Sequence, residues 1–271
     1  MTNASVLVGK ELFPISEHEQ AIRLAFEQIQ STDNKSLIVF VHGRGRHPEK
    51  SRKRIIPYLS SEYNAVVLTF HWHGSFNGGL LGFPRQEAFE SADALRRVIQ
   101  SIFSIREELD FDKEVPITLL SHSMGAFVLQ RYSEMLSSNG DSIPQGLFDQ
   151  VVFSAAAAPE KGHSRWLAQF SNSAPTHILV NRKDIMLKRA AKKAGSSRLG
   201  RAAIDSSRLA NRARYIDVAQ TGVNHRYYIN GKASSQKNNQ ALKGFFRSVF
   251  AGKDPDLGDA LTGHPQIFTL R

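Results

Sequence analysis

Ser123 follows a short apolar run and precedes a segment with helical spacing, within the sequence SHSMG (residues 121–125). A serine on so sharp a strand-to-helix turn has its Oγ exposed above the strand, and small residues two positions before and after it let strand and helix approach. The helix then directs its positive end toward a developing oxyanion, to which the Met124 N–H can donate. The pattern predicts a nucleophilic serine, with Ser121 at a position more often held by glycine.

A second turn, HGRG (residues 42–45), follows the apolar run 37–41. A glycine-rich turn directly after a buried strand can supply the second oxyanion N–H, and we expect it to come from Arg44 or Gly43. The competing interpretation is a phosphate-binding loop. The spacing is against it, because neither G-x-x-x-x-G-K-[ST] nor G-x-G-x-x-G occurs here.

A serine nucleophile needs a base and a group that orients the base. Asp184 follows the run 177–180 by a few residues, and His225 follows the run 214–218 after a glycine-containing turn. This gives the chain order serine, acid, histidine, with each group at the carboxyl end of an expected strand. Asp217 is the rival acid. It lies inside an expected strand and would have to reach His225 across the sheet edge.

Three further histidines lie near these turns. His71 and His73 alternate at one strand end and could share a face, which in principle suits a metal ion, but no third ligand is evident at a suitable spacing. We therefore expect no metal. His73 and His122 are instead expected to contact the substrate.

The elements that position these residues follow from the apolar pattern. Continuous apolar runs predict strands covered on both faces, separated by segments with helical spacing. The expected fold is α/β, a mainly parallel sheet flanked by helices on both faces, with a basic excursion after the fifth strand. The expected strands are 37–41, 65–70, 116–120, 150–154, 177–180 and 214–218, and the expected helices are 18–30, 92–103, 123–136 and 239–250.

Length and composition favour one domain over residues 1–250, with a basic insertion at about 186–213 and a peripheral C-terminal tail at 251–271. With 41% hydrophobic and 22% charged residues among 271, the chain can bury a sizeable core. It has no cysteine, which excludes disulfides and a thiol nucleophile. No secretory signal pattern or long apolar run is evident, so we expect a cytoplasmic protein.

The formal net charge of +10 is concentrated in two segments. Residues 182–214 hold eleven Lys and Arg against Asp184 and Asp205, and residues 44–54 hold six against Glu49. Both segments follow expected strands and should emerge at the edge that holds Ser123, where their field would attract anions. The alternative is a solvated basic surface unrelated to catalysis.

The chain resembles the α/β-hydrolase superfamily, and within it the bacterial α/β-hydrolases of unknown function. The resemblance spans roughly residues 36–230 and rests on IVFVHGRG, FHWHGS, LLSHSMG, VNRKDIMLKRA with RLG, and NHRYY. It implies Ser123, Asp184 and His225 as nucleophile, acid and base. The chain departs from that group at His73, where proline is more usual.

The sequence therefore predicts a serine hydrolase that cleaves a carboxylic ester or related acyl bond through an acyl-enzyme, without a cofactor. The substrate is expected to be a small or lipid-like acyl compound, with an anionic compound and peripheral membrane contact as open alternatives and no nucleic acid. The alternative from a different class is a catalytically silent module that binds lipid headgroups or nucleic acid through its basic segments. An acyltransferase with the same triad stays open.

Overall fold

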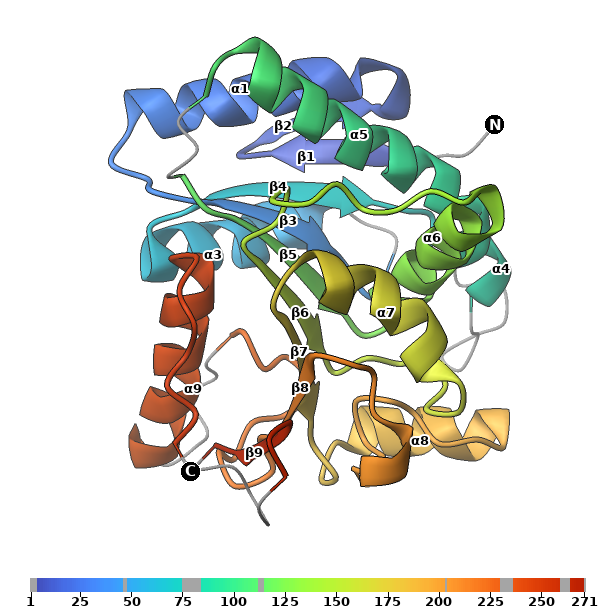
Figure 1. Ribbon diagram of the computed structural model, residues 1–271. Helices are drawn as coiled ribbons and strands as arrows, with labels where there is room; N and C mark the ends of the chain where they lie inside the picture. The colour runs from blue at the N-terminus through green and yellow to red at the C-terminus, as the bar shows by residue number, and fades with distance from the viewer. Residues whose placement is uncertain are drawn as a thin grey trace.

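A mainly parallel sheet runs through the protein, with helices on both faces (Figure 1). The computed structural model describes residues 4–45, 48–74, 84–111, 115–202, 204–229, 236–258 and 264–270. In these ranges the sheet has nine strands in the order β2-β1-β4-β3-β5-β6-β7-β8-β9. The strands are β1 (Ser5–Val8), β2 (Glu11–Pro14), β3 (Leu37–Val41), β4 (Val66–His71), β5 (Ile117–His122), β6 (Gln150–Ser154), β7 (Thr176–Val180), β8 (Ala213–Asp217) and β9 (Ile267–Thr269).

The central strands are parallel because helices connect them and cover both of their faces. Every residue of β3, β4, β5, β6 and β7 is buried, as their continuous apolar runs predict. β1 pairs antiparallel with both β2 and β4, so only this end of the sheet departs from the parallel arrangement. The α/β fold predicted from the sequence is confirmed.

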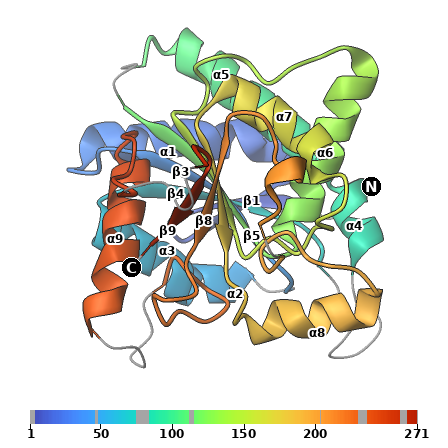
Figure 2. The ribbon, with the colours of Figure 1, turned by 60° about the horizontal axis from the view of Figure 1, so that its bottom comes forward.

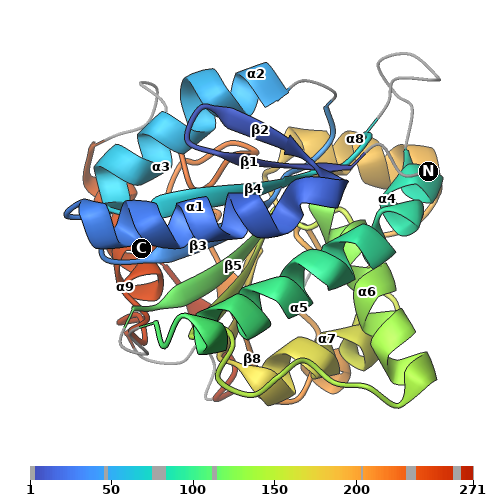
Figure 3. The ribbon, with the colours of Figure 1, turned by 90° about the horizontal axis from the view of Figure 1, so that it is seen from above.

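The helices form two layers. Figure 1 shows α3 and α9 on one side of the sheet and α6 and α7 on the other, and Figure 3 shows α1 beside α5. No helix in the described ranges has the length and apolar character needed to cross a bilayer. The helices are α1 (His18–Ser31), α2 (Pro48–Lys50), α3 (Ile56–Tyr63), α4 (Arg85–Glu90), α5 (Ala92–Glu108), α6 (Gly125–Asn139), α7 (His163–Ser173), α8 (Ile185–Ala194) and α9 (Gln236–Phe250), with a π-helix at Ser51–Ile55 and 3-10 turns at Ile15–Glu17 and Ser206–Arg208.

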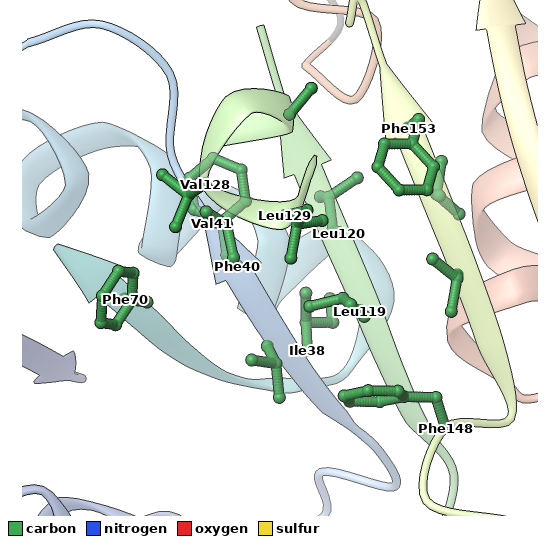
Figure 4. Close-up of a cluster of buried hydrophobic side chains, with 14 of the residues drawn as sticks. Ile38, Phe40, Val41, Phe70, Leu119, Leu120, Val128, Leu129, Phe148 and Phe153 are labelled. Atoms are coloured by element: carbon green, nitrogen blue, oxygen red, sulfur yellow. The ribbon is translucent and has the colours of Figure 1, made fainter. Parts of the chain in front are cut away.

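The core beneath the site lies between α6 and the middle strands. Figure 4 shows Val128 and Leu129 of α6 next to Val41 of β3 and Leu120 of β5. All four side chains are fully buried. Burying a side chain of this size contributes about 1.5–3 kcal/mol, so this contact holds the start of α6 firmly against the strand ends.

The segment 186–213 contains most of α8, followed by a largely irregular stretch. Leu187 is the one buried residue of α8, and Ile185 and Met186 are 62% and 49% exposed. Figure 2 shows α8 on the same end of the molecule as α2. At the other end of the chain, β9 lies within the segment expected to form a peripheral tail and extends the sheet beside β8.

His177 of β7 makes the stability of the fold dependent on pH. It is fully buried, its Nε2–H donates to Gln150 Oε1 at 2.7 Å, and burial lowers its pKa to about 3. Because an unfolded histidine has a pKa of about 6.5, the unfolded chain alone takes up this proton as the pH falls below that value. The contribution of neutral His177 to the free energy of unfolding is therefore complete above about pH 6.5. It is lost as the pH falls toward about 3.

Between about pH 7.5 and about pH 5, the free energy of unfolding should decrease less in His177→Gln than in the wild type. The difference between the two decreases should be about 2 kcal/mol. The free energy of unfolding in urea at the two pH values measures this. Equal losses in the two proteins would show that His177 does not titrate with unfolding. An overall lower stability of the variant would not affect the comparison, since each protein is referred to its own value at the higher pH.

Candidate active site

Ser123 occupies a tight turn between β5 and α6. Its φ is 53°, a left-handed conformation that side chains other than glycine rarely adopt. Three backbone hydrogen bonds hold it there: its own N–H donates to Ser154 O at 3.0 Å, and its carbonyl accepts from the N–H groups of Ala157 at 2.9 Å and Ala126 at 3.3 Å. A Cβ added at Gly125 would lie 2.5 Å from the Val41 carbonyl, so only glycine lets α6 start this close to β3.

His225 connects Ser123 to Asp184. The Ser123 hydroxyl lies 2.9 Å from Nε2 of the imidazole, and Nδ1 lies 2.8 Å from Asp184 Oδ2. With Nδ1–H donating to the carboxylate, Nε2 is left as the acceptor that faces the serine. The three residues predicted from chain order are thus brought together in the geometry of a nucleophile, a base and an orienting acid.

Asp184 is buried and uses both carboxylate oxygens. Oδ1 accepts from the Leu187 N–H at 2.9 Å and thereby caps α8, while Oδ2 accepts from the Tyr227 hydroxyl at 2.9 Å as well as from His225. Burial alone would raise the pKa of Asp184, but the hydrogen bonds and the charge of His225 outweigh it and hold the pKa below its usual value. The carboxylate is therefore ionised at neutral pH, as an orienting acid requires.

The rival acid Asp217 makes different contacts. Its Oδ1 accepts from the Ala219 N–H at 2.8 Å, and its Oδ2 lies 3.6 Å from an Arg182 nitrogen. Asp217 is the last residue of β8, and these contacts keep its carboxylate within its own strand end and the neighbouring loop. His225 therefore pairs with Asp184.

Two buried histidines support the site. The Nε2–H of His122 donates to the carbonyl of His225 at 3.0 Å, and burial, with the nearby His225, holds the pKa of His122 well below its usual value. His42 accepts from the Trp72 N–H at 3.2 Å, its Nδ1–H donates to the Gly43 carbonyl, and burial lowers its pKa to about 4. Both rings are thus neutral connectors, one to the backbone of His225 and one within the turn after β3.

The backbone groups expected to bind the oxyanion lie next to Ser123. A Cβ on Gly43 would lie 2.8 Å from His122 Nδ1 and 2.9 Å from Ser123 Cβ, which places this backbone directly against the Ser123 side chain. In the described part of the chain, no atom accepts a hydrogen bond from the Met124 N–H, which directly precedes α6. Gly43, Arg44 and Met124 all line the same cavity as Ser123.

The RLG motif (residues 198–200) connects loops of the site, a role that the sequence alone did not reveal. Arg198 is buried and donates to the Ala157 carbonyl at 3.2 Å, and the Gly200 N–H donates to the Ala156 carbonyl at 2.9 Å. A Cβ on Gly200 would lie 2.5 Å from the Ala156 nitrogen. The Asn181 N–H in turn donates to the Gly200 carbonyl at 2.9 Å, so the motif joins the loop after β6 to the loop that carries Asp184.

A cavity of about 440 Å³ opens onto Ser123 and His225. His122 lines it, and so do His42 and His71. His73 does not line it and is exposed. The sequence placed His71 and His73 on one face by strand alternation, but β4 ends at His71, so the alternation does not reach His73.

No curated protein matches the chain. Among solved structures, the poly(3-hydroxybutyrate) depolymerase LpqC of Bordetella parapertussis is 18% identical, covering 83% of this chain and 82% of its own, with a TM-score of 0.49. Carboxyl esterase 2 of Tuber melanosporum is 14% identical (82% and 79% covered, TM-score 0.49), and an esterase of Pyrobaculum calidifontis is 12% identical (87% and 91% covered, TM-score 0.43).

A family described as alpha/beta hydrolase of unknown function (DUF900) matches residues 17–242. The match begins just before α1 and ends within α9, so it includes β3 to β8 and every residue of the site described above. The chain therefore belongs to this family of alpha/beta hydrolases.

Proposed function

We propose that the protein is a serine hydrolase that cleaves a carboxylic ester or a related acyl bond through an acyl-enzyme. Ser123 Oγ attacks the acyl carbon while His225 Nε2 takes the hydroxyl proton. The tetrahedral oxyanion accepts hydrogen bonds from the Met124 N–H and from the N–H of Gly43 or Arg44. As the carbonyl reforms, the bond to the leaving alkoxide breaks, and the His225 imidazolium gives the proton to the alkoxide oxygen.

The second half of the reaction reverses the same steps with water. His225 takes a proton from water as its oxygen attacks the acyl carbon of the ester on Ser123, and then gives that proton to Ser123 Oγ as the acid leaves. Asp184 stabilises the imidazolium in both halves and is not itself protonated. The carrying observation is the continuous hydrogen-bond chain of 2.9 Å and 2.8 Å from Ser123 through His225 to Asp184.

A fluorophosphonate probe tests this proposal, because an activated serine displaces fluoride from phosphorus and stays covalently phosphonylated. We expect intact mass to show one adduct on the wild type and peptide mapping to place it on Ser123. Ser121→Ala is the matched control: this serine lies two residues away, is 1% exposed and should not affect labelling. His225→Ala should lose most labelling, since it lacks the base.

An unlabelled but folded wild type would contradict the proposal. It would favour the catalytically silent module that binds anionic partners, and salt-dependent binding would then become the informative measurement. An adduct on a residue other than Ser123 would equally exclude the assigned nucleophile.

A further inference from the structure

The cavity at Ser123 has a one-sided charge. Four cationic side chains line it: Arg44 after β3, Lys50 at the end of α2, Arg189 on α8 and Arg226 next to the catalytic base. Among the described residues that line it there is no Asp or Glu. The basic segment 44–54, α8 and the residue after His225 thus all contribute positive charge to one opening.

Lys50 and Arg226 line the same cavity without a compensating carboxylate. Burial, then the charge of Arg226 and then that of Arg54, lowers the pKa of Lys50, so these cations are close enough to repel. In the described ranges neither Lys50 nor Arg226 forms an ion pair. The adjacent carboxylate, Glu49, is instead engaged with Arg52 at 2.7 Å and with Lys53 at 3.3 Å. A repulsion of this kind costs folding free energy, and a bound anion would remove it.

Apolar side chains form another part of the cavity wall. Phe40, Ile55, Leu187 and Tyr228 line it together with the partly exposed Met186. A wall of this composition suits a hydrocarbon chain, whereas the cations suit a carboxylate or a phosphate. Both surfaces border the same space as Ser123 Oγ.

We infer that Lys50 and Arg226 form an anion subsite at the Ser123 cavity, and that the substrate is an acyl ester that itself carries a carboxylate or a phosphate. This inference rests on the proposed ester hydrolysis and adds the substrate class. The subsite holds the anionic group while the acyl carbonyl reaches Ser123, so it acts on substrate binding and orientation rather than on the chemical step.

Chromogenic esters of matched length test the subsite. The 4-nitrophenyl monoester of pimelic acid carries a terminal carboxylate, 4-nitrophenyl 6-phosphonohexanoate carries a phosphonate, and 4-nitrophenyl heptanoate carries neither. We expect kcat/KM to be at least about tenfold higher for one or both anionic esters at low salt, mainly through KM, and the preference to shrink at about 0.5 M salt. Comparison of the carboxylate and the phosphonate identifies the preferred group.

Lys50→Gln and Arg226→Gln should each lower the anionic-to-neutral ratio of kcat/KM about tenfold. Lys50 is the more informative position, because Arg226 adjoins His225. The matched control is the double variant Lys188→Gln with Lys192→Gln, which removes charge from exposed positions of α8 that do not line the cavity. It should keep the wild-type ratio. An equal fall in this control, or a wild-type ratio near one, would overturn the subsite.

A binding measurement separates this inference from the proposed function. If the wild type hydrolyses the neutral ester without any anionic preference, the subsite is wrong and ester hydrolysis stands. If it hydrolyses none of the three, calorimetric titration of Ser123→Ala with the phosphonate ester and the neutral ester still tests the subsite. Tighter binding of the phosphonate that is lost on adding Lys50→Gln would support it, and equal affinities would overturn it.

Discussion

Ser123→Ala should lower kcat for ester hydrolysis by about 10⁶-fold while leaving KM close to the wild-type value. The substitution removes the oxygen that is proposed to form the acyl-enzyme, and neither His225 nor the proposed oxyanion donors would replace it. The residual rate should come from binding and oxyanion stabilisation alone, which are typically worth about 10³–10⁴-fold over water. Steady-state kinetics with a 4-nitrophenyl ester measure the change, with the burst of nitrophenol as a second readout.

The variant is expected to remain folded, because alanine keeps the Cβ and the backbone hydrogen bonds of residue 123. Circular dichroism and the urea midpoint check this. Ser121→Ala is the control for removing a buried hydroxyl from the same turn, and it should keep wild-type kcat. A Ser123→Ala enzyme with more than a few per cent of the wild-type kcat would rule out covalent catalysis by Ser123.

Asp184→Asn should lower kcat by about 10⁴-fold. The reason lies in the two bonds of this side chain. The Leu187 N–H requires an oxygen acceptor, so an asparagine that keeps the cap of α8 directs its NH₂ group toward His225. That group donates to Nδ1, which forces the imidazole proton onto Nε2, and Nε2 can then no longer accept the proton of Ser123.

Asp217→Asn is the control for this second variant, because Asp217 was the rival acid in the sequence. It should keep kcat within about twofold, since its carboxylate contacts Ala219 and Arg182 and not the base. The pH profile of kcat adds a readout that a purely structural defect would not produce: in Asp184→Asn the residual activity should rise with hydroxide concentration as the tautomer block is bypassed. If Asp217→Asn lost more activity than Asp184→Asn, the acid would have been assigned wrongly.

The central sheet and the triad candidates were accessible from the sequence for the same reason. Buried parallel strands have continuous apolar sequences. The six runs identified correspond to β3 to β8, and most of their ends agree with the strand ends to within one residue. Because carboxyl ends of parallel strands meet at one edge, residues after β5, β7 and β8 were expected to converge. Ser123, His225 and Asp184 do meet there, joined by two hydrogen bonds.

The edges of the fold were not accessible. β2 has no fully buried residue and β9 is only half-buried, so neither carries a clear apolar pattern. α7 was also missed, although Trp166 and Leu167 are buried there. These elements depend on tertiary contacts rather than on local periodicity.

Contacts between distant loops were equally hidden. Nothing in the sequence indicates that Arg198 binds the Ala157 carbonyl or that His42 connects Trp72 to Gly43, because each of these contacts depends on the register of packed loops. Strand alternation misplaced His73 because β4 ends two residues before it. The side chains that react could be proposed from residue type and order, whereas those that hold them in position required the structure.

The double use of Asp184 has a mechanical consequence for the rim of the cavity. One carboxylate oxygen holds the first turn of α8 and the other holds the base, so the helix cannot swing away at that end without pulling the acid from His225. Opening for a bulky acyl chain would therefore have to come from side-chain rotation of Met186 or Arg189, which line the cavity, rather than from hinged movement of this end of α8. The position of His225 is thus mechanically coupled, through Asp184, to the first turn of α8, which forms one wall of the cavity.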